Sequence, residues 1–396
     1  MRLERDYKPR LHDDGCKNYV RFLIHFDNLF DENTYNRYNP AQFPARLFFM
    51  FNLLYPLIRF ILFRLDAEKS HDLTLAWLAW IEKSIFRGLI TQPLVGDPVE
   101  VCGIKFPNRV GLAAGLDKNG ICIDAFTAMG FGHIEIGTVT PRAQSGNPKP
   151  RLFRLPQAKA LINRFGFNNL GVDNLIENVK AAKFDGVLGI NIGKNFDTPV
   201  EKAINDYLIC LEKVYPYATY ITVNISSPNT ANLRELQFGE ALDDLVSAIK
   251  ESQFSLKKKH NNYVPILIKI APDLSSEEIS ELAKTFIKYN VDGVIATNTT
   301  FSRKGVEGLK YADETGGLSG KPVFESSNQV LKSMFEQANG KFPVIGVGGI
   351  CSAKDGQKKI QAGASLVQIY SGFIYQGPAL ITDVANGIKN ANKKVS

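Results

Sequence analysis

The sequence contains few cysteines, and none of them lies close to another. The chain has 396 residues, of which five are cysteines: Cys16, Cys102, Cys122, Cys210 and Cys351. Their number is odd, no two form a C-x-x-C pair, and no histidine lies at the spacing of zinc ligands. The pattern argues against a metal site and favours a reducing compartment. We interpret each cysteine as an ordinary core or surface residue.

A strong excess of one charge is also absent. Lysine and arginine together number 47 against 40 for aspartate and glutamate, and the longest basic run is residues 257–259. Nucleic-acid-binding proteins gather their basic residues into a patch or stripe, so nucleic-acid binding is not predicted. The small positive excess suits an anionic substrate and an anionic membrane surface equally well.

Near its N-terminus the chain lacks an apolar run long enough to cross a membrane, which takes about 20 residues. Residues 47–58 (LFFMFNLLYPLI) carry no charge, and Arg46, Arg59 and Arg64 surround them and the apolar residues that follow. Residues 73–85 form a second apolar stretch that contains both tryptophans. Such segments are typical of helices that lie in the membrane interface. The alternative is a pair of ordinary amphipathic helices packed on the main domain.

From Asn108 onward the sequence repeats one unit eight times: a short apolar run, a polar or glycine-rich loop, and a stretch with helical periodicity. The apolar runs are residues 109–115, 133–139, 187–193, 220–226, 265–271, 293–299, 343–349 and 366–372. Strict alternation of strand and helix implies parallel strands with right-handed crossovers. Eight units in a chain of this length predict an α/β fold, a closed (β/α)8 TIM barrel.

The barrel is predicted over residues 96–396, behind a small N-terminal helical membrane-associating segment at 44–95 and an extension of unknown role at 1–43. Residues 151–163 alternate like a small hairpin, which we expect to form a lid over the barrel. Residues 1–43 resemble neither a secretory signal nor an acid-poor transit peptide. Met50 is an alternative start site, which would make residues 1–49 an upstream extension.

Polar residues gather where the apolar runs end, and barrels of this kind place their active sites there. They are Lys118, Thr138, Asn191, Lys194, Asn224, Ser227, Asn229, Lys269, Thr297, Asn298 and Thr299. Buried amides, hydroxyls and ammonium groups need partners, so their convergence predicts a polar ligand. The last two runs end in GVGG and YSG, where backbone amides can approach a phosphate, although any one glycine could simply serve a turn. Together these features predict a flat phosphorylated heterocycle such as FMN.

The usual general bases are missing from these strand ends, because no aspartate, glutamate or histidine ends any of the eight runs. Ser227, in the motif NISSPNT, is the remaining candidate for moving a proton. A serine hydroxyl is a weak base, so it needs a water-poor setting and a relay partner such as Thr230. By itself the motif could also be a turn.

Ten motifs follow one another between Leu53 and the C-terminus: GLAAGLDKNG, IEIGTVTPR, NRFGFNNLG, GINIGKN, NISSPNT, IKIAPD, ATNTT, GGLSG, GVGGI and QIYSGF. The series resembles the motif set of class 2 dihydroorotate dehydrogenases, the quinone-dependent enzymes of bacterial type. The resemblance implies oxidation of (S)-dihydroorotate to orotate in pyrimidine (UMP) biosynthesis, with FMN as hydride acceptor and a membrane quinone as final electron acceptor.

The resemblance also implies roles for single residues. The implied FMN contacts are Ala114, Gly115, Lys118, Thr138, Asn191, Asn224, Lys269, Thr297, Gly320, Gly349, Tyr370 and Ser371. The implied substrate contacts are Lys118, Asn163, Arg164, Phe165, Gly166, Phe167, Asn224, Asn229, Asn298 and Thr299. Ser227 holds the family's base position and is expected to take a proton from C5 while a hydride leaves C6. The implied quinone contacts are His71, Arg154 and Tyr370, between the N-terminal helices and the flavin.

Two rival interpretations stay open on the sequence. The soluble class of the same family reduces fumarate or NAD, but it usually has cysteine where this chain has Ser227. A phosphate-binding barrel isomerase or a ligand binder without flavin has the same fold class and would be colourless. With neither a transit-like peptide nor a full membrane span, we expect a peripheral protein on the cytoplasmic face of a bacterial inner membrane, and a mitochondrial origin is the alternative.

Overall fold

The structure is a computed structural model, and it describes residues 43–230 and 233–392. The extension predicted at residues 1–43 lies outside these ranges except for its last residue. Within the described ranges, no helix combines the length and the apolar character that crossing a membrane requires.

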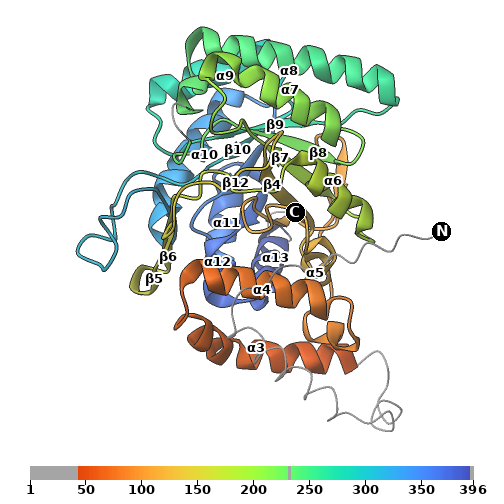
Figure 1. Ribbon diagram of the computed structural model, residues 1–396, viewed down its shortest axis with the longest axis vertical. Coiled ribbons are helices and arrows are strands. Elements are labelled where there is room, and N and C mark those ends of the chain that lie inside the picture. Colours follow the sequence, from red (N-terminus) through yellow and green to blue (C-terminus); the bar gives the residue numbers. More distant parts are fainter. Residues whose placement is uncertain (1–42, 231–232, 393–396) are drawn as a thin grey trace, which may run out of the picture.

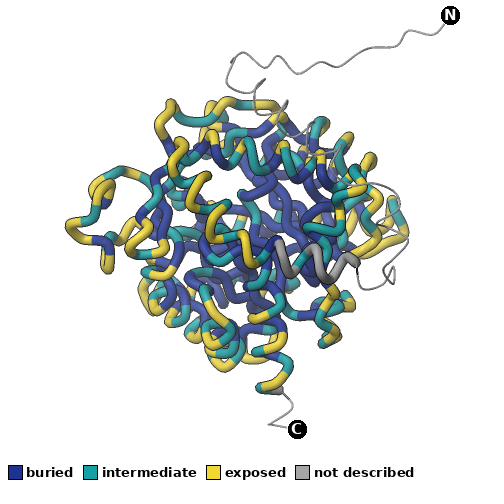
Figure 2. Tube along the Cα trace, turned by 90° about the horizontal axis from the view of Figure 1, so that it is seen from below, coloured by how far each residue is buried: buried dark blue, intermediate teal, exposed yellow. Residues whose placement is uncertain are grey.

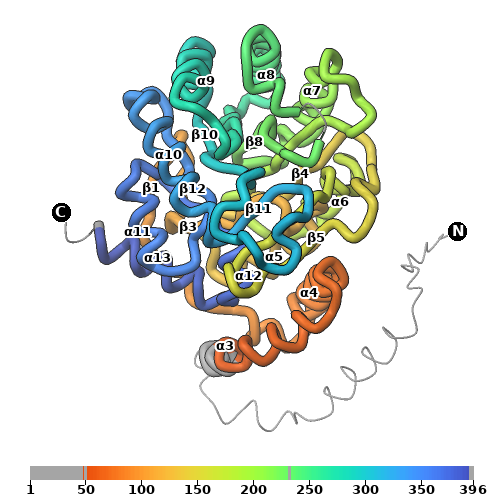
Figure 3. Tube along the Cα trace, turned by 90° about the vertical axis from the view of Figure 1, so that its left-hand side faces the viewer, coloured from red at the N-terminus to blue at the C-terminus, as the bar shows by residue number. Residues whose placement is uncertain are grey.

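Eight strands close into a barrel at the centre of the molecule, with helices arranged around it (Figure 3). The strands are β3 (Val110–Leu112), β4 (His133–Val139), β7 (Leu188–Ile192), β8 (Tyr220–Asn224), β9 (Ile266–Ile270), β10 (Gly293–Ala296), β12 (Val344–Val347) and β13 (Ala364–Ile369). Their order around the barrel is β10-β12-β13-β3-β4-β7-β8-β9, and every neighbouring pair is parallel. Each strand overlaps one predicted run, so the predicted TIM barrel is confirmed.

Helices lie around the outside of the barrel (Figure 1). The helices of the barrel region are α5 (Ile123–Ala128), α6 (Val172–Ala181), α7 (Ala203–Val214), α8 (Gly239–His260), α9 (Ser276–Lys288), α10 (Phe324–Ala338), α11 (Ala353–Gln361), α12 (Ser371–Gln376) and α13 (Ala379–Asn392). Helix α9 shows why such segments are helical: Ser275 and Glu278 form a capping box, and Ile279, Leu282 and Phe286 recur at helical spacing on the buried side. Buried residues accordingly fill the middle of the molecule (Figure 2).

Two small sheets cover the ends of the barrel. Strands β5 (Leu152–Leu155) and β6 (Ala160–Asn163) form the predicted hairpin, and β11 (Gly317–Gly320) extends it to three antiparallel strands. Strands β1 (Val99–Val101) and β2 (Ile104–Phe106) pair at the other end, where Phe106 contacts His133 at the start of β4. Neither β11 nor the β1–β2 hairpin was predicted.

The two predicted N-terminal helices are present as α3 (Phe43–Leu62) and α4 (Ala67–Ile81), which lie side by side at one side of the barrel (Figures 1 and 3). Helix α3 is fastened to the barrel by Tyr55, whose hydroxyl donates to the carbonyl oxygen of Ile374 at 2.8 Å. Helix α4 buries Leu75, Leu78 and Ile81. The two helices also contact each other through a stacked pair, Phe51 on Trp77.

Candidate active site

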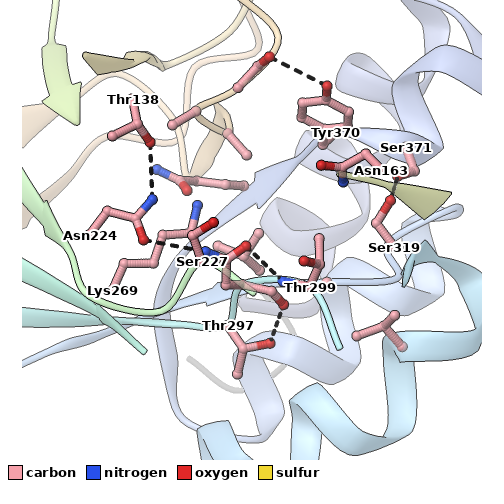
Figure 4. Close-up of a pocket in the computed structure, with 18 of the residues that line it drawn as sticks. Thr138, Asn163, Asn224, Ser227, Lys269, Thr297, Thr299, Ser319, Tyr370 and Ser371 are labelled. Carbon is pink, nitrogen blue, oxygen red and sulfur yellow. Dashed lines mark hydrogen bonds between the residues drawn. The ribbon is translucent and has the colours of Figure 1, made fainter. Parts of the chain in front are cut away.

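A cavity opens at the carboxyl ends of the barrel strands, the end at which barrel enzymes place their active sites (Figure 4). Most of the residues predicted from the sequence line it: Ala114, Gly115, Lys118, Thr138, Asn163, Phe165, Gly166, Phe167, Asn224, Ser227, Asn229, Lys269, Thr297, Asn298, Thr299, Gly320, Gly349, Tyr370 and Ser371. They come from strand ends that are far apart in the sequence. Closure of the barrel is therefore what brings them together.

One wall of the cavity is made of backbone, because its residues have no room for side chains. Gly349 follows β12 with a φ of 77°, and a Cβ there would lie 2.5 Å from the backbone of α10. A Cβ on Gly372 would lie 1.9 Å from a backbone carbonyl oxygen. The hydroxyls of Ser319 and Ser371 are 2.8 Å apart at the same wall. Amides and hydroxyls are the donors that a phosphate needs, so this wall fits the phosphate of FMN.

The floor of the cavity is a chain of hydrogen-bonded amides and hydroxyls. Asn224 Nδ2 donates to Thr138 Oγ1 at 3.0 Å, and Thr138 Oγ1 donates to Asn191 Oδ1 at 2.6 Å. Asn191 Nδ2 donates in turn to the buried carboxylate of Glu135 at 2.8 Å. Gln368 Oε1 is buried and has no hydrogen-bond partner in the described part of the chain. A ring with N–H and C=O groups supplies such partners, so the floor fits the heterocycle of FMN.

Lys269, near the end of β9, places a positive charge beside these amides. Its side chain is buried, and within residues 43–230 and 233–392 it forms no ion pair. Burial lowers the pKa of Lys269, and the carboxylate of Glu135 opposes that shift. A cation in this position stabilises the negative charge of a reduced flavin.

Ser227 lies in the loop after β8, and its side chain faces the cavity (Figure 4). The residue is 5% exposed, and its Oγ accepts a hydrogen bond from the backbone N–H of Asn229 at 3.2 Å. No carboxylate or imidazole lines the cavity in the part of the chain that the structure describes. The hydroxyl of Thr230 is also buried and has no partner there. The water-poor setting that a serine base needs is therefore present.

Lys118 lines the cavity from the loop after β3. Its Nζ is 4.0 Å from the centre of the Phe165 ring. Burial lowers the pKa of Lys118 to about 8, while the carboxylates of Asp72 and Glu68 oppose the shift. The ammonium form therefore exists at neutral pH, and it can bind the carboxylate of a small substrate.

Four asparagines around Ser227 are held in two hydrogen-bonded pairs, Asn229 with Asn163 and Asn298 with Asn224. Asn229 Nδ2 donates to Asn163 Oδ1 at 3.1 Å. Asn298 Nδ2 lies 3.3 Å from Asn224 Oδ1 and 3.1 Å from Ser226 Oγ. Ordered amides of this kind can bind the ring amides of a substrate and fix its orientation.

A match to a family model identifies the family to which this protein belongs. The model for dihydroorotate dehydrogenase covers residues 98–391, the whole barrel. The chain belongs to the dihydroorotate dehydrogenase family. Proteins named dihydroorotate dehydrogenase (quinone) from Aliivibrio fischeri and Proteus mirabilis are each 60% identical to it over 336 residues, which is 85% of this chain and 100% of theirs.

Solved structures of the family have the same fold. A dihydroorotate dehydrogenase from Eimeria tenella in complex with ferulenol aligns with a TM-score of 0.76 and 35% identity, over 83% of this chain and 92% of that one. The ligand-free form of the Eimeria protein aligns equally well, with a TM-score of 0.76. The chain therefore shares the fold of solved dihydroorotate dehydrogenases.

Two predicted contacts of the family, Asn191 and Arg164, do not line the cavity. Asn191 is completely buried beneath it and reaches the cavity only through Thr138 and Asn224. The guanidinium of Arg164 lies 2.7 Å from a carboxylate oxygen of Glu314 and is held in that ion pair. Glu314 is 150 positions later in the chain, so the sequence near Arg164 gives no sign of this partner.

Of the three residues that the family resemblance assigns to quinone, Tyr370 lines the cavity and the other two lie on the side of α3 and α4. Burial, together with the nearby positive charge of Lys118, lowers the pKa of His71 to about 3. The imidazole is therefore neutral. Arg154 donates to the hydroxyl of Ser70 in α4 at 3.0 Å and to the carbonyl oxygen of Leu62, the last residue of α3, at 3.3 Å, which ties β5 to both N-terminal helices.

Several residues that build the site were not predicted from the sequence. Ser319 and Gln368 line the cavity, and Glu135 lies beneath it. Ser319 lies in β11, which is too short and too rich in glycine to be recognised as a strand. Glu135 and Gln368 lie inside apolar runs. A polar residue within an otherwise buried strand is the signal that could have identified both, because buried polar groups need partners.

Proposed function

We propose that Ser227 acts as the base in the reaction of this family. The chain is an enzyme that oxidises dihydroorotate to orotate in pyrimidine biosynthesis, with FMN as its cofactor and a quinone as its electron acceptor. FMN, when bound, accepts the hydride from C6 of dihydroorotate and passes the electrons on to the quinone. The observation that carries the proposal is the position of Ser227: a buried hydroxyl that faces a cavity lined by no carboxylate or imidazole in the described ranges.

Ser227 takes the proton from C5 of dihydroorotate on its Oγ, and the hydroxyl must release its own proton as it does so. The amide of Asn229 already donates to this oxygen, which favours the developing negative charge. The hydroxyl of Thr230, which has no hydrogen-bond partner within the described residues, accepts the released proton and passes its own on to solvent. Ser227 is nearly closed to water, so bulk solvent has little direct access to the proton at Oγ.

We assign the substrate contacts to the residues that converge on Ser227. Lys118 binds the carboxylate of dihydroorotate, since it is one of the two lysines that line the cavity within the described ranges. The amides of Asn163, Asn229 and Asn298 bind the ring amides. The hydrogen bond between Asn229 and Asn163, and those from Asn298 to Asn224 and Ser226, keep them oriented before substrate arrives. Fixed orientation of C5 and C6 is what such contacts contribute to the rate.

An anaerobic titration of the purified protein tests the function. We expect a flavin absorbance band that dihydroorotate bleaches and that a quinone analogue restores, whereas fumarate and NAD do not. A flavin band that ignores dihydroorotate would refute the substrate. Recovery with fumarate or NAD instead of quinone would assign the chain to the soluble class, and a colourless protein that takes up no FMN would refute the cofactor.

We propose that residues 44–95 bind the membrane surface and give the quinone access to the flavin along His71, Arg154 and Tyr370. The outer face of α3 is apolar, with Leu53 71%, Leu57 57% and Phe60 56% exposed. A helix with an exposed apolar face and neighbouring arginines is typical of interfacial binding. The proposed surface is the cytoplasmic face of a bacterial inner membrane, and residues 96–396 form the catalytic barrel.

Replacing Leu53 and Leu57 with glutamate is expected to weaken binding to anionic lipid vesicles by roughly tenfold or more for each residue, because each exposed leucine then loses its burial in the bilayer. Vesicle co-sedimentation measures the bound fraction. Ile209→Glu is the matched control, since Ile209 is an exposed apolar residue of α7 (44%), on the far side of the barrel from α3. Unchanged vesicle binding of the double variant would refute α3 as the membrane face.

A further inference from the structure

Lys359, on the inner side of α11, is a lysine without contact with solvent. The residue is 0% exposed, and its Nζ donates to Ser327 Oγ at 2.6 Å and to the carbonyl oxygen of Val347 at 3.4 Å. No carboxylate forms an ion pair with it in residues 43–230 and 233–392. A buried ammonium without a counter-ion is costly, so its position calls for a partner that the chain alone does not supply.

The ammonium lies behind the wall of the cavity that contains Gly348 and Gly349, here called the glycine wall. Ser327 Oγ is 3.3 Å from the carbonyl oxygen of Gly348, so the carbonyls of both Val347 and Gly348 point toward this Lys359–Ser327 pair. In a planar trans peptide the N–H points opposite to the preceding carbonyl. The N–H groups of Gly348 and Gly349 therefore point toward the cavity, which both residues line.

Neither Gly346 nor Gly348, the glycines on either side of Val347, has room for a side chain. Gly348 has a φ of 117°, and a Cβ there would lie 2.8 Å from Ser327 Oγ. A Cβ on Gly346 would lie 3.1 Å from Cδ of Lys359. Only backbone therefore separates the ammonium from the wall that fits a phosphate.

On the basis of the phosphate position proposed beside Gly349 and Ser371, we propose that Lys359 is a buried counter-charge for the phosphate of FMN and makes retention of the cofactor depend on pH. Lys359 does not touch the phosphate. It acts as a positioning residue. Together with the backbone N–H of Thr297 it donates to the carbonyl oxygen of Val347, and it donates to the Ser327 hydroxyl that bonds the carbonyl oxygen of Gly348. It also adds a positive charge behind the amides that face the cavity.

The pH dependence has a definite sign. Burial lowers the pKa of Lys359 to about 7, while the carboxylates of Glu325 on α10 and Asp355 on α11 oppose the shift. Strands β12 and β13 carry no titratable side chain, and Asp383 and Lys389 of α13 make no hydrogen bond or ion pair to Lys359 in the described ranges. The ammonium is therefore present below about pH 7 and is lost above it, so the phosphate is held more weakly at alkaline pH.

A competition between FMN and riboflavin isolates this effect, because the two flavins differ only in the phosphate. FMN-loaded full-chain enzyme is equilibrated with riboflavin, and the two flavins retained on the protein are quantified between pH 6 and pH 9. In the wild type we expect the preference for FMN to fall about tenfold across this range, which corresponds to about 1.4 kcal/mol. The FMN phosphate itself loses its second proton near pH 6. Both proteins share this titration, so it cancels when the wild-type preference at each pH is divided by the preference of Lys359→Met.

Lys359→Met is expected to lower the preference at pH 6 by about the same tenfold factor and to abolish its fall at higher pH. Lys358→Met is the matched control: Lys358 is exposed, precedes Lys359 on α11 and lies over the same Phe324 ring. This control is expected to behave as the wild type. Ser327→Ala keeps the lysine but removes its hydrogen-bond partner, and it is expected to move the fall to lower pH.

The outcomes separate this role from the phosphate position on which it depends. A wild-type preference for FMN that stays level or rises between pH 7 and pH 9 overturns the role of Lys359 without any variant. A Lys359→Met protein that prefers FMN as strongly as the wild type would also overturn the role of Lys359. It would leave the proposed phosphate position beside Gly349 and Ser371 intact. Equal retention of FMN and riboflavin by the wild type at every pH would overturn the phosphate position itself.

Discussion

Replacing Ser227 with alanine is expected to slow the reduction of bound flavin by dihydroorotate by a factor of about 10² to 10⁴, the usual contribution of a positioned general base. The hydroxyl faces the cavity, and no carboxylate or imidazole lines it in the described ranges, so no neighbouring group can take over the proton. Anaerobic stopped-flow absorbance of the flavin band measures the rate directly and separates it from the later reaction with quinone.

Orotate binding is the control for this variant. Ser227 acts on the C5 proton that dihydroorotate has and orotate has lost, so Ser227→Ala is expected to bind orotate with an affinity close to that of the wild type. A variant that loses orotate affinity and reduction rate by the same factor would show that Ser227 positions the ligand and does not act as base.

Ser227→Cys gives a second, pH-dependent readout. A thiol takes up a proton only as the thiolate, and an unperturbed cysteine has a pKa of about 8.5. The flavin reduction rate of this variant is therefore expected to rise as the pH increases through the thiol pKa, and to exceed that of Ser227→Ala at high pH. A rate that does not respond to the thiol titration would argue that the side chain at position 227 plays no part in proton transfer.

The strands and the convergence of the site could be predicted because both follow from local sequence. Strands of a closed parallel barrel are buried on both faces, so each appears as a nearly continuous apolar run. β8, from Tyr220 to Asn224, is buried at every position. The residues that end the runs meet at one end of the barrel by symmetry, and so the sequence alone places Lys118, Asn224 and Lys269 in one cavity.

The direction in which a side chain turns and the partners it finds far along the chain could not be predicted. Lys194 ends an apolar run like the others, yet its Nζ turns to the carbonyl oxygens of Asn195 and Thr198 and does not reach the cavity. Arg164 is directed by Glu314. Lys359 lies in an amphipathic helix, where a lysine normally indicates the solvent face, and only the three-dimensional packing shows that it is buried.

Glu135 is another such residue, and its replacement by alanine is expected to lower the free energy of unfolding by roughly 3–5 kcal/mol, the cost of removing one member of a buried charged network. Its carboxylate accepts hydrogen bonds from Gln368 Nε2 at 2.7 Å, Asn191 Nδ2 at 2.8 Å and the hydroxyl of Tyr220 at 3.1 Å. Deletion leaves these donors buried without their acceptor, at about 1–3 kcal/mol each.

Removal of the Glu135 carboxylate is also expected to disturb the flavin site, because this carboxylate fixes the orientation of the Asn191 side-chain amide. With Nδ2 bound to Glu135, Oδ1 faces Thr138 and Asn224 at the floor of the cavity. Without the carboxylate the amide is free to rotate, and the floor loses its fixed order. FMN affinity is therefore expected to fall together with stability.

Urea unfolding at a fixed excess of FMN measures the stability effect, since bound ligand adds to the apparent free energy of unfolding. Tyr220→Phe is the graded control: it removes a single donor to the same carboxylate and is expected to cost about 0.5–1.5 kcal/mol. If Glu135→Ala unfolded at the wild-type urea concentration, the three hydrogen bonds would not hold the floor of the cavity. If it cost no more than Tyr220→Phe, Glu135 would act as an ordinary hydrogen-bond acceptor and its charge would have no part in the network around Lys269.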